Sequence, residues 1–546
     1  MSSAEVVAVY PNRVKIAVHN IAELADGEPV EVGSYLKVYD NTESAIIAII
    51  ENYSIELRPS KEGDLERIYM LEAVPLGIID RDGHFERGGG GIAIPPKTVS
   101  VAFKDEVQRI YNTVDSENRF HFAQLAQDEE VDVPVDGNKF FSRHLAVVGS
   151  TGSGKSHAMA RIIQKATELR DESEPEEYSL NNTHVIIFDL HAEYRTAFPE
   201  ANHLGVESLV LPYWLLNSEE LQDLFIESNE EQSHNQIAIL KRTITEGKKA
   251  HFSGSEDERD LIHYDSPLFF DIDDVLAAIK DKNEERIDTS TSARKSDKAG
   301  PLFGKLDNFI TRLENRRNDR RLDFLLGDRA KSVRLEQVLR QFTGYIEGAQ
   351  ANVTVIDLSG VPFEVLSLTV SLVSRLLFDY SYYFKKKNVD GRSETPLLVV
   401  YEEAHKYVPK SGLAKYSSSR NAIERIAKEG RKYGITAAIV SQRPAEISET
   451  IFSQCNNFLA MRLTNPEDQN YVKRLIPDSL GPLTESLPML SAGEALLIGD
   501  AAVMPSRVRL EDAHPSPSSS DVMYLREWAR PWRNVHFDPI VKDWER

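Results

Sequence analysis

A glycine-rich segment, residues 149–156, has the residue types and spacing of a phosphate-binding P-loop. Its pattern is Gly149, four residues, and then Gly154, Lys155 and Ser156, which is the full Walker A sequence. Glycines allow backbone N–H groups to approach phosphate oxygens without interference from a Cβ atom. We expect Lys155 to reach the β- and γ-phosphates and the Ser156 hydroxyl to bind Mg²⁺. The expected nucleotide contacts are Gly149, Thr151, Gly152, Ser153, Gly154, Lys155, Ser156 and His157.

A pair of carboxylates follows the apolar run at residues 397–401. In P-loop ATPases, the first acid after such a strand orients the Mg²⁺ shell and the next polarises the attacking water. We expect Glu402 to take the first role. Because its side chain is longer than that of the usual Asp, it is expected to reach magnesium through water. Glu403 is expected to act on the attacking water. The alternative is two solvated acids at the end of a strand.

A second acidic cluster follows the apolar run at residues 185–188. It contains Asp189, His191 and Glu193, and its carboxylates could face the γ-phosphate or the waters of the metal. We include Asp189 among the candidate metal ligands, with Ser156 and Glu402. A purely structural role for the cluster is an equal alternative.

A third group of polar residues surrounds the apolar run at residues 435–440. Gln442 follows this run, and a polar residue at the end of a strand next to a P-loop is placed to sense the γ-phosphate. Arg425 and Arg431 precede it and could neutralise transition-state charge, as an arginine finger in a neighbouring subunit if they project from the subunit edge. The alternative for each arginine is a salt bridge on a helix surface.

These residues need a scaffold that brings the ends of several strands together. From residue 139 onward, apolar runs alternate with helical sequence, which predicts an α/β fold with a parallel sheet covered on both faces. We expect the nucleotide at the carboxyl ends of these strands. The runs are residues 145–148, 185–188, 353–356, 397–401, 437–440 and 458–463.

The flanking regions have different patterns. Residues 1–135 contain short β-rich pieces separated by turn signals, which predict a small β-barrel or sandwich used for assembly or partner docking. Residues 217–350 are charged and helical and form an expected insertion in the core of residues 136–216 and 351–504. The insertion carries an arginine-rich run at residues 312–321, which is either a solvated helix face or a contact for DNA or a partner. Residues 505–546 form a tail with three tryptophans, expected to pack on its own domain or on an adjacent subunit.

The overall composition limits the function classes. The formal net charge of −22 repels nucleic acid, so any contact with DNA requires a local basic surface. The single cysteine, Cys455, excludes a disulfide within the chain and fits a reducing compartment. No apolar run approaches the length of a membrane span, and we expect a soluble cytoplasmic protein without a membrane partner.

In combination, these motifs resemble the HerA family of the HerA/FtsK superfamily. The segments that carry the resemblance are residues 149–156, 189–194, 211–215, 401–405, 430–434 and 441–444. The resemblance implies a RecA-like core, an N-terminal barrel, a helical bundle at the insertion, and a homo-hexameric ring. Such a ring hydrolyses ATP at subunit interfaces and moves duplex DNA through its pore, with a NurA-type or other nuclease or a sirtuin-like effector in DNA end processing or antiphage defence. In the family, the C-terminal tail tends to reach the adjacent subunit. Two departures are Glu402 in place of Asp and Ala192 in place of a common glycine.

Two alternatives to a DNA translocase remain. One is a scaffold ATPase that assembles and regulates an effector enzyme with little translocation of its own, which the acidic net charge favours. The other is a small-molecule kinase. It is disfavoured because the paired acids Glu402 and Glu403 suit the activation of water.

Overall fold

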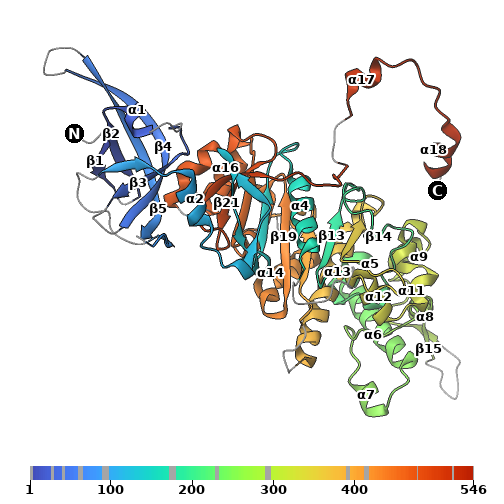
Figure 1. Cartoon of the computed structure of the whole chain (residues 1–546). Helices are drawn as coiled ribbons and strands as arrows, with labels where there is room; N and C mark the ends of the chain where they lie inside the picture. Colours follow the sequence, from blue (N-terminus) through green and yellow to red (C-terminus); the bar gives the residue numbers. More distant parts are fainter. Residues whose placement is uncertain are drawn as a thin grey trace.

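The computed structural model describes residues 4–10, 12–25, 30–39, 44–59, 65–80, 82–88, 98–170, 180–227, 233–288, 297–388, 394–410, 417–475, 478–518 and 522–544. Figure 1 shows the N-terminal strands at one end of an elongated molecule, the central sheet in the middle and a group of helices at the other end. The N- and C-terminal segments lie far apart.

The central sheet has eleven strands, and seven of them are parallel. Each of the six apolar runs named above contributes a parallel strand, so the expected α/β fold is confirmed. The run at residues 145–148 is completely buried because helices and loops cover both faces of the sheet. In spatial order the parallel strands are β20 (Asn457–Met461), β12 (Leu145–Val148), β19 (Ile435–Ser441), β18 (Leu397–Tyr401), β13 (His184–Asp189), β17 (Val353–Asp357) and β14 (Asn202–Leu204).

Four antiparallel strands extend this sheet beyond β20. They are β21 (Glu494–Gly499), β22 (Ser506–Leu510), β9 (Ala123–Leu125) and β10 (Asp128–Asp132). The expected boundaries after residue 135 and before residue 505 therefore differ from the structure, which places β9, β10 and β22 in the central sheet. The pairing of β9 with β22 joins segments from opposite ends of the chain, and no local sequence pattern signals such a contact.

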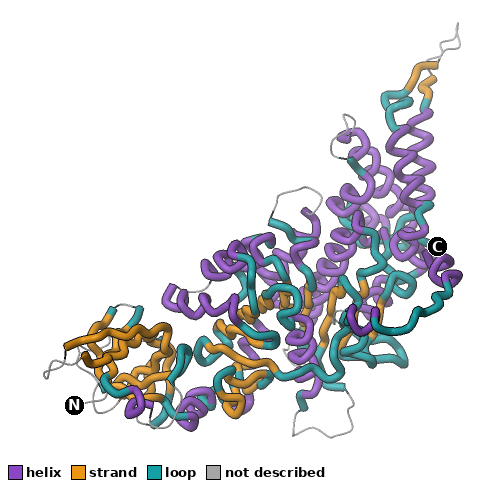
Figure 2. The backbone as a smooth tube through the Cα atoms, turned by 90° about the horizontal axis from the view of Figure 1, so that it is seen from above, coloured by secondary structure: helices purple, strands orange, loops and turns teal. Residues whose placement is uncertain are grey.

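Helices connect the parallel strands. Helix α4 (Lys155–Glu168) follows β12, α13 (Phe363–Lys387) joins β17 to β18, and α14 (Ser417–Glu429) packs against α13 and joins β18 to β19. Figure 2 shows helices gathered on the side of the molecule away from the N-terminal strands. The remaining elements of the central part are α3 (Gly137–Ser142), α15 (Glu449–Phe452), α16 (Pro466–Leu475), β8 (Arg119–Phe120) and β11 (Val135–Asp136).

The N-terminal strands form a separate antiparallel sheet with its own hydrophobic core. An isolated bridge between Glu5 and Thr98 connects its first strand to the segment that enters its last. Two long strands, β4 and β5, pair along their whole length, and the distal half of β4 is exposed. The elements are β1 (Ala4–Val9), β2 (Val14–Val18), α1 (Ile21–Ala25), β3 (Tyr35–Tyr39), β4 (Ser44–Pro59), β5 (Leu65–Asp80), β6 (Phe85–Arg87), β7 (Val99–Val101) and α2 (Lys104–Tyr111).

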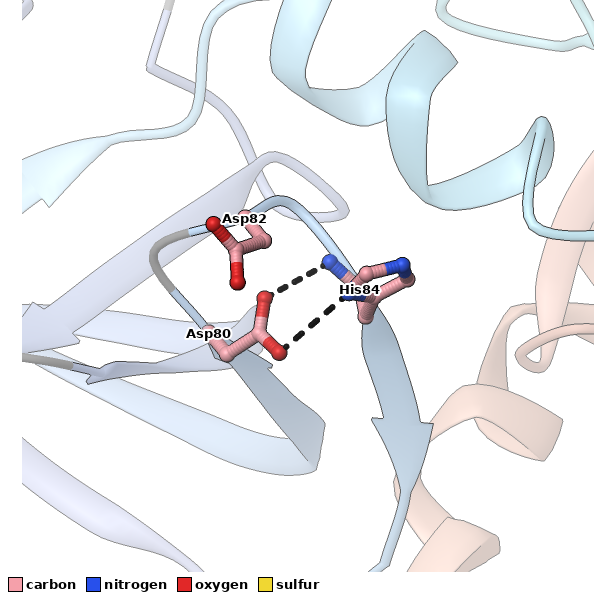
Figure 3. A group of neighbouring side chains, drawn as sticks. All are labelled: Asp80, Asp82 and His84. Atoms are coloured by element: carbon pink, nitrogen blue, oxygen red, sulfur yellow. Dashed lines mark hydrogen bonds and ion pairs between the residues drawn. The ribbon is translucent and has the colours of Figure 1, made fainter.

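The turn between β5 and β6 groups three exposed polar residues, Asp80, Asp82 and His84 (Figure 3). The Asp80 carboxylate accepts a hydrogen bond from the backbone N–H of His84 at 2.8 Å, and it lies 3.4 Å from the imidazole Nδ1. These contacts are those of an aspartate that stabilises a tight turn. The position of Asp80 is therefore explained by the hairpin itself.

Residues 218–343 are mainly helical, and the arginine-rich run of the sequence lies on α9 and the turn that follows it. Three of its arginines contact acids of the same chain: Arg312 binds Glu227, Arg317 binds Asp273, and Arg321 binds Asp319. These ion pairs favour the interpretation as a solvated helix face. The elements are α5 (Ser218–Phe225), α6 (Ser233–His251), α7 (Glu256–Asp260), α8 (Ile272–Glu284), β15 (Arg286–Asp288), β16 (Asp297–Ala299), α9 (Asp307–Arg317), α10 (Asp323–Leu326), α11 (Asp328–Ser332) and α12 (Leu335–Thr343).

The chain ends in two short helices, α17 (Tyr524–Trp528) and α18 (Phe537–Trp544), which project from the core (Figure 1). The tryptophans of this segment are exposed: Trp528 on α17 by 74%, Trp544 on α18 by 87%, and Trp532 between the helices by 95%. Across the described parts of the chain, no helix combines the length and the apolar character that a membrane span requires.

Candidate active site

The P-loop lies at the carboxyl end of β12, where α4 begins at Lys155. Gly152 and Gly154 have φ angles of 70° and 102°, which belong to the left-handed region that glycine adopts most readily. A Cβ atom on Gly149 would lie 2.5 Å from the Ser153 hydroxyl, so this position also requires glycine. The loop therefore presents the N-terminus of α4 as an anion-binding site.

A pocket of about 360 Å³ adjoins the loop. Six of the eight expected nucleotide contacts line it: Thr151, Gly152, Gly154, Lys155, Ser156 and His157. The other two, Gly149 and Ser153, are not among its lining residues. Other segments contribute Glu193, Glu403, Gln442, Ala492, Gly493, Leu510, Glu511 and Asp512.

Glu403, Gln442 and Thr151 form a hydrogen-bonded chain across the pocket. The Gln442 amide donates to one oxygen of Glu403, and the Thr151 hydroxyl donates to the Gln442 carbonyl. The second oxygen of Glu403 lies 3.2 Å from Nδ1 of His405, whose pKa is lowered by burial. The structure thus brings the expected water-activating acid, the expected γ-phosphate sensor and the P-loop into direct contact.

Glu402 lies behind the pocket. Its side chain is buried and accepts a hydrogen bond from the Tyr194 hydroxyl. Burial raises the pKa of Glu402 to about 8, and the charge of Glu403 adds to this effect. A buried carboxyl group whose oxygen is already hydrogen-bonded to Tyr194 is better placed for an indirect role at the metal than for a direct one.

Both carboxylate oxygens of Asp189 accept hydrogen bonds from backbone N–H groups. One of its oxygens accepts from the N–H groups of His191 and Glu193, and the other accepts from Tyr194 at 2.9 Å. Burial raises the pKa of Asp189 against these hydrogen bonds, which lower it. The geometry therefore differs from the expected metal-ligand position. Glu193 lies closer to the P-loop, since its carboxylate accepts a hydrogen bond from the Ser156 hydroxyl at 2.6 Å.

Lys155 extends within the loop and donates to the carbonyl of Ser150 at 3.4 Å. Burial lowers the pKa of its ammonium group, while the nearby carboxylates of Glu403, Glu402 and Glu193 oppose this effect. The lysine is therefore held in a partly desolvated, acidic environment, where a charged group interacts strongly with a phosphate.

The two candidate finger arginines lie outside this pocket. Arg425, on α14, binds Asp379 at 3.2 Å and stacks over Phe378. Arg431 lies just before β19, at the amino-terminal ends of the parallel strands, whereas the P-loop lies at their carboxyl ends. It lines a second cavity of about 490 Å³. Within one chain, neither arginine reaches the nucleotide pocket.

Two features of the pocket were missed in the sequence. Tyr194, which donates a hydrogen bond to Glu402, lies in the segment of residues 189–194. Nothing in the sequence of that segment indicates that its tyrosine contacts Glu402. Of the lining residues Leu510 to Asp512, the first ends the antiparallel strand β22 and the other two follow it, and this segment has no motif. Only the folded sheet places that strand beside the P-loop.

The chain is similar to several known proteins. A family model for the central domain of helicase HerA matches residues 120–377. The DNA double-strand break repair helicase HerA of Sulfurisphaera tokodaii is 27% identical over 499 residues, which cover 89% of this chain and 87% of that protein. A probable helicase of Methanocaldococcus jannaschii is 25% identical over 530 residues, 93% of this chain and 91% of that protein.

The resemblance to the HerA family is confirmed. The chain is an ATP-hydrolysing enzyme. Among solved structures, VirB4 of Thermoanaerobacter pseudethanolicus is 13% identical with a TM-score of 0.49, and the match covers 73% of this chain and 98% of that one.

Proposed function

We propose that this protein is a ring-forming motor that hydrolyses ATP to move duplex DNA. The observation that carries the proposal is the contact between Glu403, Gln442 and the P-loop residue Thr151, which joins a water-activating acid to a phosphate sensor. A motor needs this link because its sheet must respond when the γ-phosphate is lost. The relatives named as DNA double-strand break repair helicases support DNA as the substrate.

In this proposal, Lys155 binds the β- and γ-phosphates and Glu403 accepts a proton from the attacking water. Gln442 orients Glu403 and senses the γ-phosphate. The buried hydroxyl of Tyr194 holds Glu402 in place below them. The roles of Glu403, Gln442 and Tyr194 use contacts that already exist between side chains of the chain.

The donor set also fits Mg²⁺. The pocket places the Ser156 hydroxyl beside Glu193 and Glu403, and it contains more acids than bases. A triphosphate would be repelled by these acids without a divalent cation, so we assign Ser156 as the ligand and Glu193, with Glu402 indirectly, as support for its waters. When bound, the ion neutralises charge on the phosphates. Asp189 serves this group by fixing the backbone of Glu193 and Tyr194.

We also propose a homo-hexamer with its ATP sites between subunits. Arg431 is exposed at the amino-terminal ends of the parallel strands, so it can reach a phosphate only in a neighbouring subunit. Arg425 is paired with Asp379 and is the weaker candidate for this finger.

Residues 4–101 form a small β-barrel in this proposal, since the Glu5–Thr98 bridge joins the two edges of their sheet, and residues 218–343 form the helical insertion. The barrel is the docking surface for a nuclease or a sirtuin-like effector in DNA end processing or antiphage defence.

A second candidate function is a scaffold ATPase that assembles an effector with little translocation. The net charge of −22 and the exposed apolar residues on the distal half of β4, Tyr53, Ile55 and Leu57, favour this candidate. The two functions differ in one measurement. A translocase shows ATP hydrolysis that duplex DNA stimulates and that falls steeply with salt, because phosphate contacts release counterions. A scaffold ATPase shows neither effect, and deletion of residues 1–101 abolishes its co-purification with the effector.

Two substitutions test the catalytic assignment. We expect Lys155→Ala to abolish ATP hydrolysis. Glu403→Gln should retain bound ATP but hydrolyse it about 10²- to 10⁴-fold more slowly, the usual contribution of a general base. The matched control is Glu347→Gln, an exposed acid remote from the pocket, which should hydrolyse ATP at the wild-type rate. Normal turnover by Glu403→Gln would remove Glu403 from its role.

A further inference from the structure

One end of the nucleotide pocket has no role in phosphate binding. It is formed by Ala492 and Gly493, before β21, and by Leu510, Glu511 and Asp512, at the end of β22. Gly493 donates its N–H to the carbonyl of Ser153 at 3.0 Å, and Leu510 donates to Gly493 at 2.9 Å. This end is therefore fastened directly to the P-loop. Because phosphates occupy the N-terminus of α4, the nucleoside of a bound nucleotide must extend into the remaining part of the pocket.

The two acids at this end differ in their surroundings. Glu511 is bound by Arg161 and Lys165 of α4, and its other oxygen lies 3.1 Å from Nδ1 of His121. Its carboxylate is therefore occupied by bases of the same chain. Asp512 is exposed, and no ion pair to it is found among the residues that the structure describes.

Asp512 also belongs to a well-fixed segment. Residues 511–518 run across α4 toward the tail (Figure 1), and Gln164 of α4 donates to the carbonyl of Pro515 and accepts from the N–H of His514. At the far end, the N–H of Ser518 donates to the carbonyl of Glu193 at 2.9 Å. The segment thus connects the nucleoside end of the pocket with the residue that contacts Ser156. A side chain on such a support is held in place well enough to discriminate between ligands.

A free carboxylate in a pocket for a polyanion must face hydrogen-bond donors, since it would repel phosphate. A nucleoside offers two kinds of donor: the ribose hydroxyls and the exocyclic amine of adenine. We propose that Asp512 recognises the nucleoside of the bound nucleotide by accepting hydrogen bonds from these donors. The inference rests on the proposed function, because it takes the P-loop pocket as the ATP site.

The test is calorimetric titration of the full chain with Mg²⁺ and three nucleotides that cannot be hydrolysed at a γ-phosphate: ADP, 2′,3′-dideoxyADP and IDP. Asp512→Asn removes the charge that strengthens these hydrogen bonds and replaces one acceptor oxygen by a donor, so it should weaken ADP binding by about 10-fold. The substitution should leave unchanged the binding of whichever analogue already lacks the recognised donor. If Asp512→Asn and the wild type bind dideoxyADP equally well, the ribose hydroxyls are the recognised donors. If they bind IDP equally well, the recognised donor is the exocyclic amine.

The matched control is Asp281→Asn, an exposed aspartate on α8 away from the pocket, which should bind all three nucleotides as the wild type does. Equal affinities of Asp512→Asn and wild type for ADP would overturn the inference, as would equal weakening of all three nucleotides. Either result leaves the proposed function intact as long as wild-type binding depends on Lys155. A wild-type chain that binds none of the nucleotides would overturn the proposed function as well.

Discussion

Among the residues that the structure describes, two that are not glycine adopt left-handed backbone conformations: Glu403, which lines the nucleotide pocket, and Ala192, which precedes the lining residue Glu193. Ala192 has a φ angle of 56° and Glu403 a φ angle of 49°. Such a conformation costs about 1–2 kcal/mol for a residue with a Cβ atom. At Glu403, the strain directs the carboxylate toward Gln442 and away from the line of β18. Strained backbone is common where a side chain must be aimed at a reacting group.

Ala192 allows a direct test of this strain, because its side chain is not needed for any contact with the pocket. Ala192→Gly removes the Cβ atom from a left-handed position, and we expect the free energy of unfolding to rise by about 1 kcal/mol. The measurement is the thermal midpoint of the full chain. Ala349→Gly serves as the control, because Ala349 is exposed and has an ordinary φ angle, and it should lower the midpoint slightly. A lower midpoint for Ala192→Gly would contradict the argument from strain.

At the scale of residues, the sequence predicts the side chains that follow a parallel strand better than their contacts. Lys155, Glu403 and Gln442 each end or follow a buried strand, so their meeting at one edge of the sheet could be expected. The assignment of Asp189 could not be settled in this way. Its place at the end of an apolar run led us to expect a metal ligand, but its oxygens accept hydrogen bonds from the N–H groups of the turn that follows β13.

Among the elements, α5 and α13 are joined by a buried ion pair. Arg375 of α13 binds Glu220 of α5 at 2.7 Å, and the Glu220 side chain is completely buried. The same guanidinium donates to the carbonyl of Leu215, while Ser371 donates to Glu220. Through these contacts the helical region of residues 218–343 is attached to the long helix that leads to the catalytic strand β18.

We expect Arg375→Ala to destabilise the protein by about 3–5 kcal/mol, since it leaves a buried carboxylate without its partner. Arg242→Ala is the matched control, because Arg242 forms an exposed pair with Glu246 on α6, and its loss should change the stability little. Both values come from chemical denaturation of the full chain. If both substitutions had a similarly small effect, water would be taking the place of Arg375 beside Glu220, and the argument from the buried pair would fail.

Helix α6 contains a second buried charge, Lys248. Its ammonium group donates to the carbonyls of Tyr264 and Ser266, and burial lowers its pKa to about 8. Between pH 8 and the ordinary lysine pKa of 10.5, the unfolded chain binds a proton that the folded chain has lost. This contribution to the free energy of unfolding therefore increases as the pH rises through that range.

The Lys248→Met substitution removes this group. We expect the stability of the wild type relative to Lys248→Met to increase by up to about 3 kcal/mol between pH 8 and 10.5, from the size of the pKa shift. Thermal midpoints of both proteins across this range provide the measurement. A constant difference between them would show that Lys248 keeps its ordinary pKa.

At the scale of the whole molecule, the sequence predicts the parallel core but not its antiparallel extension. Six of the seven parallel strands are continuous apolar runs, which are recognisable by themselves, whereas the short edge strand β14 is not. Strands β9 and β22 are short and half polar, and their identity depends on pairing between the two ends of the chain. The same pairing places Leu510 to Asp512 at the nucleotide pocket, so this part of the site could not be found before the sheet was known.

The C-terminal tail presents more apolar surface than a free segment normally exposes. Leu525, Trp528, Trp532, Phe537 and Trp544 are each at least two-thirds exposed, and they lie on or between α17 and α18. Helices this short are not stable alone in water. We therefore expect the tail to pack against an adjacent subunit of the proposed ring, where burial of aromatic side chains stabilises the contact.

Removal of residues 522–546 should shift the protein from hexamers to smaller species, as measured by light scattering at a fixed concentration. ATP hydrolysis should fall with the loss of hexamers, because a finger arginine supplied by a neighbour is then absent. Trp532→Ala should cause a partial shift and Lys542→Ala, a change of an exposed charge on α18, almost none. Both substitutions keep the full length of the chain. They therefore distinguish the loss of an aromatic contact from an effect of shortening the chain. If the truncated protein formed hexamers as stable as those of the full chain, the tail would not pack against an adjacent subunit. Its exposed apolar side chains would then be assigned to a different partner.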